Sequence, residues 1–217
     1  MADAGPYVPA LGHERLTGLY DPVVRLTTRE HAFKERLLTQ AAIHPGMSVL
    51  DLGAGTGTLA ILVKRRVPAA RVSGLDGDPR MLARARAKAA EAGLELEFDQ
   101  GMSSELPYPP AQFDRVLSTL FFHHLAPADK RRTVREISRV LRPGGELHVA
   151  DWGRPSDPLM AVLSRSIKLL DGVETTRENF AGALPSIFVE AGLERVRERD
   201  RMRTVYGTLA FYSAARA

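Results

Sequence analysis

The stretch "VLDLGAGTGTLA", Val49 to Ala60, decides the fold of this chain. An apolar run closes on an acid, Asp51, followed by three glycines in five residues and then by residues of helical character. A strand that turns at once into a helix places backbone N–H groups at the positive helix end, where a carboxylate-bearing or nucleotide-like ligand can approach. Glycine suits this turn because a Cβ would occupy the ligand's space or forbid the dihedral angles. We therefore expect a ligand site here, rather than a tight turn without a ligand.

Two acids near the glycines narrow the choice of ligand. A dinucleotide fingerprint, G-x-G-x-x-G, would need glycine where this chain has Thr58. Asp51 would repel a pyrophosphate and attract an amino group, so the turn favours an amino acid headgroup. Asp76 ends the next apolar run, roughly twenty residues past the glycines, where a carboxylate can accept hydrogen bonds from both ribose hydroxyls. A helix cap is the alternative role for Asp76, but Asp78 before Pro79 is better placed to cap.

Strand-like and helix-like segments alternate up to Trp152. Helices are expected from Thr27, where Thr27 and Glu30 match a capping box, after the glycines, from Pro79 and from Pro127. The strands between them are expected to begin within "HPGMSVLDLG" and to lie at "ARVSGLD", "LELEFDQG", "FDRVLSTLFF" and "ELHVADW". This rhythm predicts an α/β fold with a doubly wound, mostly parallel sheet.

The C-terminal third departs from this rhythm. An apolar helix is expected in "DPLMAVLSRSIKLL", followed by two short helices separated at Pro185 and by two strands that form an antiparallel addition at one sheet edge. We therefore expect an N-terminal helical extension or lid over residues 1–44. A single domain over residues 45–217 follows, with a helical insertion at about 153–191.

Composition excludes several classes of function. The 217 residues contain no cysteine, so disulfides, thiolate metal sites and cysteine nucleophiles are ruled out. The net charge of +4 comes with arginines spaced among alanines, as on a solvated helix face, and no nucleic-acid motif accompanies it. No apolar run reaches membrane-spanning length. We expect a cytoplasmic protein without a nucleic-acid partner or a transmembrane segment; the sequence leaves a homodimer open.

Four segments together resemble a known family. "VLDLGAGTG", "GLD", "LPYPPAQFDRVLS" and "EISRVLRPGGELHVAD" are similar, in order and spacing, to signature segments of class I S-adenosylmethionine-dependent methyltransferases. The branch they most resemble contains the ubiquinone and menaquinone biosynthesis methyltransferases, and the likeness covers about Gly46 to Trp152. It implies a Rossmann-like sheet of seven strands, six parallel and the last antiparallel. It also implies S-adenosylmethionine as cofactor and a small-molecule acceptor.

The resemblance also implies how the cofactor lies. The glycines would pack against its methionine part, Asp76 would hold the ribose, and Thr119 would border the sulfonium. Where the family usually has an acid that binds the adenine amine, this chain has Met102. Adenine recognition is then left to the backbone and Ser103, with Met102 stacked on the ring. The full set of expected cofactor residues is Tyr20, Asp51, Gly53, Ala54, Gly55, Gly57, Asp76, Gly77, Met81, Gly101, Met102, Ser103 and Thr119.

Acceptor chemistry is expected beyond the fourth and fifth strands, because ligands of open parallel sheets bind outside the carboxyl ends. His123 is a candidate general base or acceptor-orienting group, while His124 could instead satisfy a buried backbone group. Asp151 is a candidate to bind or deprotonate the acceptor, with a plain loop acid as the alternative. No metal site is expected, because side chains of adjacent residues on a strand or turn point apart and no third ligand is evident.

The acceptor is expected to be hydrophobic or aromatic. Apolar residues in "LTGLYDPVVRL" and in the insertion predict a lid over it, with Tyr20 near the cofactor; plain core packing is the alternative. Two other functions stay open, namely an inactive S-adenosylmethionine-binding scaffold or regulatory protein and, less favoured by the glycine spacing, a nicotinamide-dependent oxidoreductase.

Overall fold

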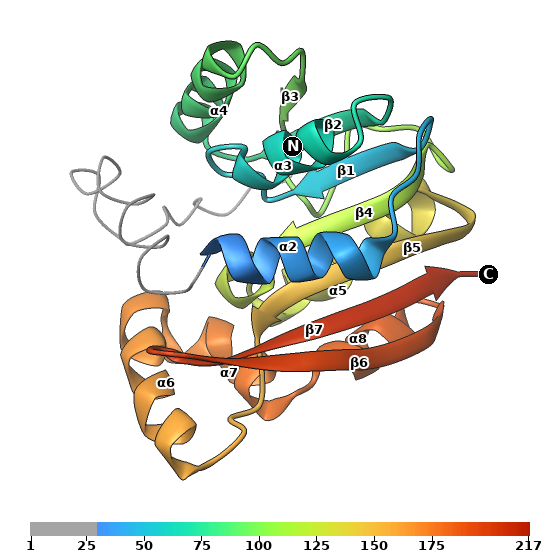
Figure 1. The fold of residues 1–217 in the computed structure, drawn as a ribbon. Coiled ribbons are helices and arrows are strands. Elements are labelled where there is room, and N and C mark those ends of the chain that lie inside the picture. The colour runs from blue at the N-terminus through green and yellow to red at the C-terminus, as the bar shows by residue number, and fades with distance from the viewer. Residues whose placement is uncertain (1–29) are drawn as a thin grey trace, which may run out of the picture.

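The computed structural model describes residues 30–217 and contains one seven-stranded sheet in the order β3-β2-β1-β4-β5-β7-β6 (Figure 1). The strands are β1 Ser48–Leu52, β2 Arg71–Asp76, β3 Glu97–Gln100, β4 Phe113–Thr119, β5 Leu141–Trp152, β6 Leu193–Thr204 and β7 Gly207–Arg216. Only β7 runs antiparallel to its neighbours in the sheet so described. The predicted fold class, including the antiparallel last strand, is confirmed.

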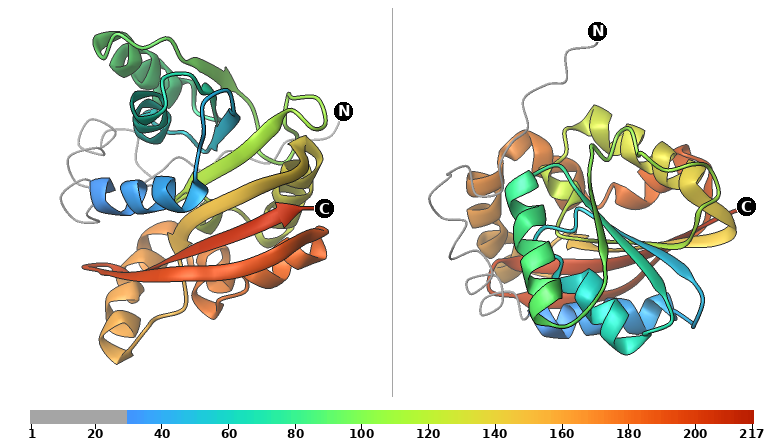
Figure 2. Two further views of the ribbon diagram at one scale, coloured as in Figure 1. Left: turned by 45° about the vertical axis from the view of Figure 1, so that its right-hand side comes forward. Right: turned by 90° about the horizontal axis from the view of Figure 1, so that it is seen from above.

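Helices cover both faces of the sheet (Figure 2). The helices are α2 Glu30–Ala41, α3 Thr58–Arg66, α4 Pro79–Glu91, η1 Phe122–His124, α5 Pro127–Val140, α6 Pro158–Asp171, α7 Val173–Ala181 and α8 Leu184–Glu190. Successive residues of a strand point to opposite faces. Val49 accordingly packs with α2, α3 and α4, and Leu50 packs with α5 and α8. The central strands are buried on both sides, as their continuous apolar runs predict.

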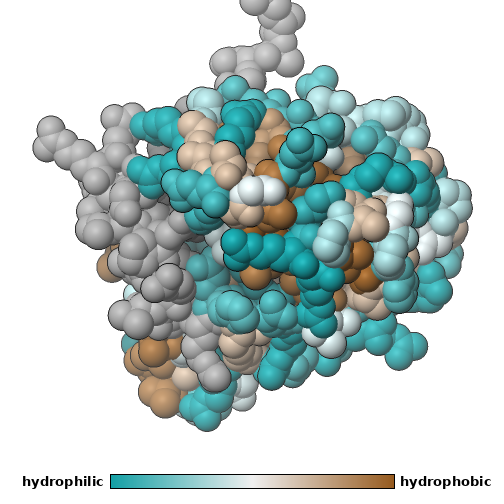
Figure 3. Space-filling view, turned by 45° about the horizontal axis from the view of Figure 1, so that its top comes forward, coloured by the Kyte–Doolittle hydropathy of each residue, from teal (hydrophilic) through white to brown (hydrophobic). Residues whose placement is uncertain are grey.

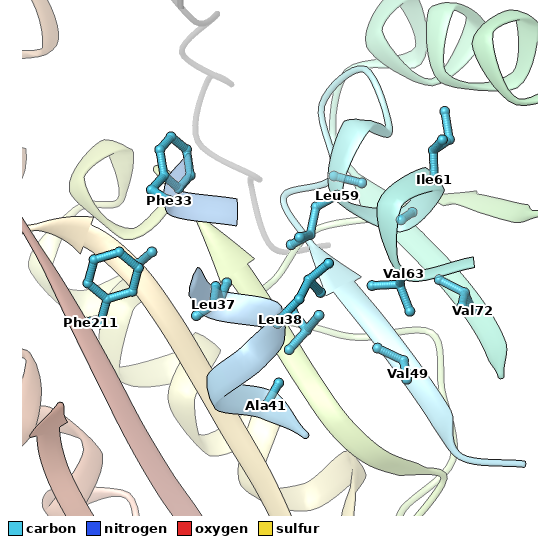
Figure 4. Packing of buried hydrophobic residues seen from close by; sticks show 14 of the residues in the cluster. Phe33, Leu37, Leu38, Ala41, Val49, Leu59, Ile61, Val63, Val72 and Phe211 are labelled. Atoms are coloured by element: carbon cyan, nitrogen blue, oxygen red, sulfur yellow. The ribbon is translucent and has the colours of Figure 1, made fainter. Parts of the chain in front are cut away.

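Helix α2 is a layer of the domain rather than a cover over it. Its apolar side lies between Phe211 of β7 and Leu59 of α3 (Figure 4). Gln40 also donates a hydrogen bond to the Tyr212 carbonyl at 2.9 Å. Because Phe33, Leu37 and Ala41 are fully buried, Glu30–Ala41 packs in the core, and the domain division at residue 44, which sets apart the extension over residues 1–44, stays a prediction. The rest of that segment, including Tyr20 and the predicted cap Thr27, lies outside the described residues.

The insertion after β5 consists of α6, α7 and α8. The last two helices separate at Gly182, which has a φ of +76°, and not at Pro185 as predicted. Pro185 instead lies in the first turn of α8, where its missing N–H costs no helical hydrogen bond. Across residues 30–217, the helices are too short or too polar to cross a bilayer.

Candidate functional site

The three glycines of the turn after β1 have different surroundings at the position where a side chain would begin. All three have positive φ angles, between +54° and +73°. A Cβ on Gly53 would lie 2.4 Å from Phe121 Cδ2, and one on Gly57 would lie 2.8 Å from Phe98 Cζ. A Cβ on Gly55 would meet no atom of the described part of the chain within 4 Å. Gly53 and Gly57 therefore admit close packing within the protein, while Gly55 faces open space.

Asp51 is buried with one carboxylate oxygen unpartnered. Its side chain points toward α3, where Oδ2 accepts a hydrogen bond from the Ala60 N–H at 3.0 Å, and the residue is 1% exposed. Oδ1 is buried and has no hydrogen-bond partner among residues 30–217. Burial raises the pKa of Asp51 to about 6, although the positive charge of Lys34 on α2 and the Ala60 N–H oppose the shift. Since buried polar atoms are normally hydrogen-bonded, Oδ1 calls for a donor that residues 30–217 do not supply.

Asp76, at the end of β2, connects the glycine turn to the start of α4. Its Oδ2 accepts from the Gly55 N–H at 2.8 Å, and its Oδ1 accepts from the Asp78 N–H at 2.9 Å. Asp78 caps α4 by accepting from the Arg80 N–H at 2.8 Å, which confirms the predicted cap. Burial raises the pKa of Asp76 even though these N–H groups lower it. Each Asp76 oxygen keeps a further lone pair that can accept from a hydroxyl.

The other predicted cofactor residues follow the neighbouring strands at the same edge. Gly101, directly after β3, donates its N–H to the Asp76 carbonyl at 3.1 Å. Met102 is 47% exposed, so its side chain is available to a ligand. The Ser103 hydroxyl forms a hydrogen bond with the Thr133 hydroxyl of α5 at 2.8 Å, so only the backbone of Ser103 is left to bind adenine. Of the remaining members, Met81 and Ala54 are buried, and Gly77 and Thr119 are half-buried.

Asp151 is buried in a different way from Asp51. Its Oδ2 accepts from the N–H groups of Phe121 and Phe122, at 3.0 and 2.7 Å. Its Oδ1 contacts His123 Nδ1 and accepts from the Trp152 N–H, both at 2.7 Å. Burial alone would raise the pKa of Asp151, but the paired His123 and the N–H donors lower it. Because four donors occupy this carboxylate, it does not fit the predicted role of binding or deprotonating an acceptor. Asp151 instead positions η1 and His123.

The two histidines lie side by side. Their ring centroids are 3.9 Å apart in η1, and Asp171 at the end of α6 approaches both rings. Burial would lower the pKa of His123, but the carboxylates of Asp151 and Asp171 together raise it to about 9. For His124, burial and the positive charge of His123 lower the pKa to about 4. The expectation that the side chains point apart is wrong, because successive residues of a 3₁₀ turn differ by about 120° and not by the about 180° of a strand.

Three residues of this edge escaped sequence reasoning, namely Lys34, Phe121 and Asp171. Asp171 did carry a signal, since an acid in the last turn of a helix opposes the helix dipole and suggests a partner elsewhere. Lys34, paired with Glu30 at 2.5 Å, and Phe121, packed over Gly53, follow from long-range packing that no local pattern encodes.

Comparison with known proteins agrees with this geometry. A family profile for a methyltransferase domain matches residues 49–145. A demethylmenaquinone methyltransferase of Deinococcus radiodurans is 35% identical over 136 residues, covering 63% of this chain and 56% of that protein. An uncharacterized methyltransferase of a Synechocystis species is 32% identical over 184 residues, covering 83% of this chain and 84% of that protein. The chain spans about half the length of the demethylmenaquinone methyltransferases that it matches.

A solved structure, that of the (4+2)-cyclase SpnF, has a TM-score of 0.68 at 22% identity, over 85% of this chain and 80% of that chain. The likeness to SpnF concerns the fold alone. The residues at the strand ends fit S-adenosylmethionine, since the unpartnered Asp51 oxygen suits an ammonium group, Gly55 admits close approach, and Asp76 can accept from hydroxyls. By sequence and by fold, the chain belongs to the class I S-adenosylmethionine-dependent methyltransferases.

Proposed function

We propose that this chain transfers a methyl group from S-adenosylmethionine to a small hydrophobic or aromatic acceptor. One observation carries the cofactor half of the proposal, namely the buried and unpartnered Oδ1 of Asp51 beside the open Gly55. A pyrophosphate would be repelled there, whereas the ammonium of an amino acid headgroup would supply the missing donor. When bound, S-adenosylmethionine supplies an electrophilic methyl group.

The chain's residues would bind and orient the cofactor. Asp51 would accept from the amino group, and Gly55 would let the methionine part approach the backbone. Asp76 would accept from the ribose hydroxyls, and the exposed Met102 would lie against the adenine. Methyl transfer is an in-line displacement, so the contribution of such residues is to hold the two reacting groups in line and to exclude water.

The acceptor would lie beyond β4 and β5, near Phe121 and His123. Asp151 would act as a positioning residue by holding the His123 ring through Nδ1. Trp152 is buried and lies edge-on to His123, with ring centroids 6.3 Å apart, so it would support that ring. A relative named for demethylmenaquinone and the apolar surroundings of this edge support an aromatic, apolar acceptor.

A lid over the acceptor remains part of the proposal. Apolar side chains of α6 are exposed, and Figure 3 shows apolar surface at the lower left, on the side of α6. The exposed members are Leu159, Val162, Leu169 and Leu170, whereas Met160 and Ile167 of the predicted lid are core residues. A homodimer stays a prediction, which sedimentation analysis would test.

The cofactor test is titration calorimetry with S-adenosylhomocysteine. We expect one binding site per chain, and at least tenfold weaker binding in Asp51→Asn, because an amide leaves the ligand's ammonium without a charged partner. Asp129→Asn, which changes an acid in the first turn of α5, should bind as the unchanged protein does. Unchanged affinity in Asp51→Asn would refute the headgroup assignment.

The activity test is methyl incorporation from labelled S-adenosylmethionine into a panel of phenols, quinols and aliphatic amines. The proposal expects product with the aromatic members. A second candidate function is cofactor binding without methyl transfer, which Met102 in place of the family's acid favours. Tight binding of S-adenosylhomocysteine with no product from any panel member would favour that second function.

A further inference from the structure

Three side chains at the carboxyl ends of β4 and β5 converge on one point. His123 and His124 of η1 and Asp171 of α6 each offer a ligand atom, and these atoms lie within 4.8 Å of one another. They are the one such group among residues 30–217. Two imidazoles and one carboxylate form a ligand set that suits first-row divalent metal ions.

The distances between these groups decide how the cluster is best interpreted. Asp171 Oδ2 lies 3.5 Å from His123 Nε2, and Asp171 Oδ1 lies 3.9 Å from His124 Nδ1. Both separations exceed the 2.7 to about 3.2 Å of a hydrogen bond from nitrogen to oxygen. Two ligands of a tetrahedral ion bound at about 2.0 to 2.1 Å lie roughly 3.3 Å apart. The 3.5 Å separation is close to that of two ligands that share an ion, and the 3.9 Å separation requires His124 or Asp171 to move slightly closer when the ion binds.

The surroundings of His123 match those of a metal-binding histidine. Its Nδ1 is 2.7 Å from Asp151 Oδ1, and the remaining Asp151 contacts come from rigid backbone N–H groups. Metal-binding histidines typically donate their second ring N–H to a carboxylate, which fixes the ring orientation and leaves the other nitrogen free to bind the ion. With Nδ1 committed to Asp151, Nε2 is the atom directed at Asp171.

We propose that His123 Nε2, His124 Nδ1 and the Asp171 carboxylate bind a divalent transition-metal ion such as Zn²⁺. His123 and Asp171 side chains are only 3% and 9% exposed, whereas that of His124 is 28% exposed and gives an ion access from solvent. Three protein ligands leave a coordination position open. Phe121 packs over Gly53 just before η1, so the ion lies near the proposed acceptor position and can bind an acceptor oxygen.

The test uses the untagged 217-residue chain after dialysis against a chelator. Zn²⁺ is titrated by calorimetry, and Co²⁺ by its visible absorption, which reports coordination by protein ligands. We expect one equivalent of each ion to bind, with affinity at least tenfold lower in Asp171→Asn and in His124→Gln. Because neither titration involves S-adenosylmethionine, a failure of the proposed methyl transfer leaves this result standing.

Two control variants address unspecific binding. Glu174→Gln removes an exposed acid from α7, which contacts η1, and His31→Gln removes an exposed histidine from α2. Both should bind as the unchanged chain does, and circular dichroism checks that every variant is folded. If Asp171→Asn fails to fold, the partly exposed His124→Gln decides. Absence of stoichiometric binding, or binding that His124→Gln leaves unchanged, overturns the proposal.

Discussion

Asp51 and Asp151 are nearly identical in burial and opposite in chemistry. They are 1% and 0% exposed, and both lie near the carboxyl end of a central strand. Asp51 has one N–H donor and an unpartnered oxygen, and its pKa is raised to about 6; Asp151 has four partners and a lowered pKa. Donors, rather than depth, decide whether a buried carboxylate is stable as an anion. Asp51, whose hydrogen-bonding capacity is not filled, suits a ligand, whereas Asp151, whose capacity is filled, stabilises the fold.

The largest expected effect is the loss of stability in Asp151→Asn. The amide replaces one acceptor oxygen by a donor that faces N–H groups, and it removes the nearer of the two carboxylates that pair with His123. Breaking a buried pair in this way costs about 3 to 5 kcal/mol of unfolding free energy, measured by chemical denaturation. Asp157→Asn is the control, because Asn caps α6 as well as Asp does. A loss no larger than in this control would mean that Asp151 is not a structural anchor.

In the glycine turn, we likewise expect one glycine, Gly57, to matter for stability and another, Gly55, to matter for ligand binding. In Gly57→Ala, the new Cβ meets Phe98 and Ala85 below 3.0 Å in a left-handed backbone conformation, so we expect a loss of about 2 to 4 kcal/mol. Gly55→Ala carries the conformational strain alone and should lose about 1 kcal/mol. For affinity the order of the two variants reverses: relative to the stability that each loses, Gly55→Ala should weaken S-adenosylhomocysteine binding more than Gly57→Ala does. Equal losses of stability in both variants would refute the division.

Asp51→Asn should stabilise the fold while it weakens cofactor binding. A pKa that rises from 3.8 to about 6 means that the ionised form opposes folding. This corresponds to roughly 3 kcal/mol at neutral pH, of which the neutral amide should recover a part. Thermal unfolding at about pH 7.5 should therefore show a higher melting temperature for the variant. A lower melting temperature would indicate that Oδ1 has a partner within the chain.

The smallest expected effect is the pH dependence of cofactor affinity. Only the ionised Asp51 pairs with an ammonium group, so affinity for S-adenosylhomocysteine should fall as pH drops through about 6. The stability of the fold changes in the opposite direction. As pH rises, the Asp51 carboxyl loses its proton in the unfolded state before it does so in the folded state. The Asp51 contribution to the free energy of unfolding therefore falls as pH rises from about 4 to about 6. Calorimetry across this range tests the first statement. Asp51→Asn should lack both dependences, and a variant that keeps them would assign the titration to another group.

Local pattern predicted that the acids and glycines of the proposed cofactor site meet at one edge of the sheet. Asp51, the glycines and Asp76 are adjacent in sequence to strands whose apolar runs are unmistakable, and parallel pairing of β1 with β2 brings them together. The Asp78 cap was likewise predictable, because capping depends on residues within one turn. The antiparallel direction of β7 came from the family resemblance, but its place between β5 and β6 was not predicted, since strand order depends on contacts between distant segments.

For the site around His123, the sequence indicated which residues take part but not how they contact one another. His123 and Asp151 were expected near each other, but the saturation of Asp151 by backbone N–H groups depends on how η1 folds back over β5. The close approach of the two histidine rings depends on a 3₁₀ turn, whereas the sequence analysis expects a strand or turn whose side chains point apart. Asp171 reaches them from 47 positions beyond His124, along a helix whose orientation only packing determines.

The sequence by itself determined the alternation of strands and helices, the glycine turn and the acids beside it, because these depend on apolar periodicity and on dihedral angles within a few residues. Only the tertiary structure decided which of the buried carboxylates is satisfied and which oxygen is unpartnered. It also decided that Phe121 fills the space over Gly53 and that Asp171 meets the histidines. Hydrogen-bond satisfaction and close packing depend on distances between segments far apart in the chain, and these distances exist only after the sheet has formed.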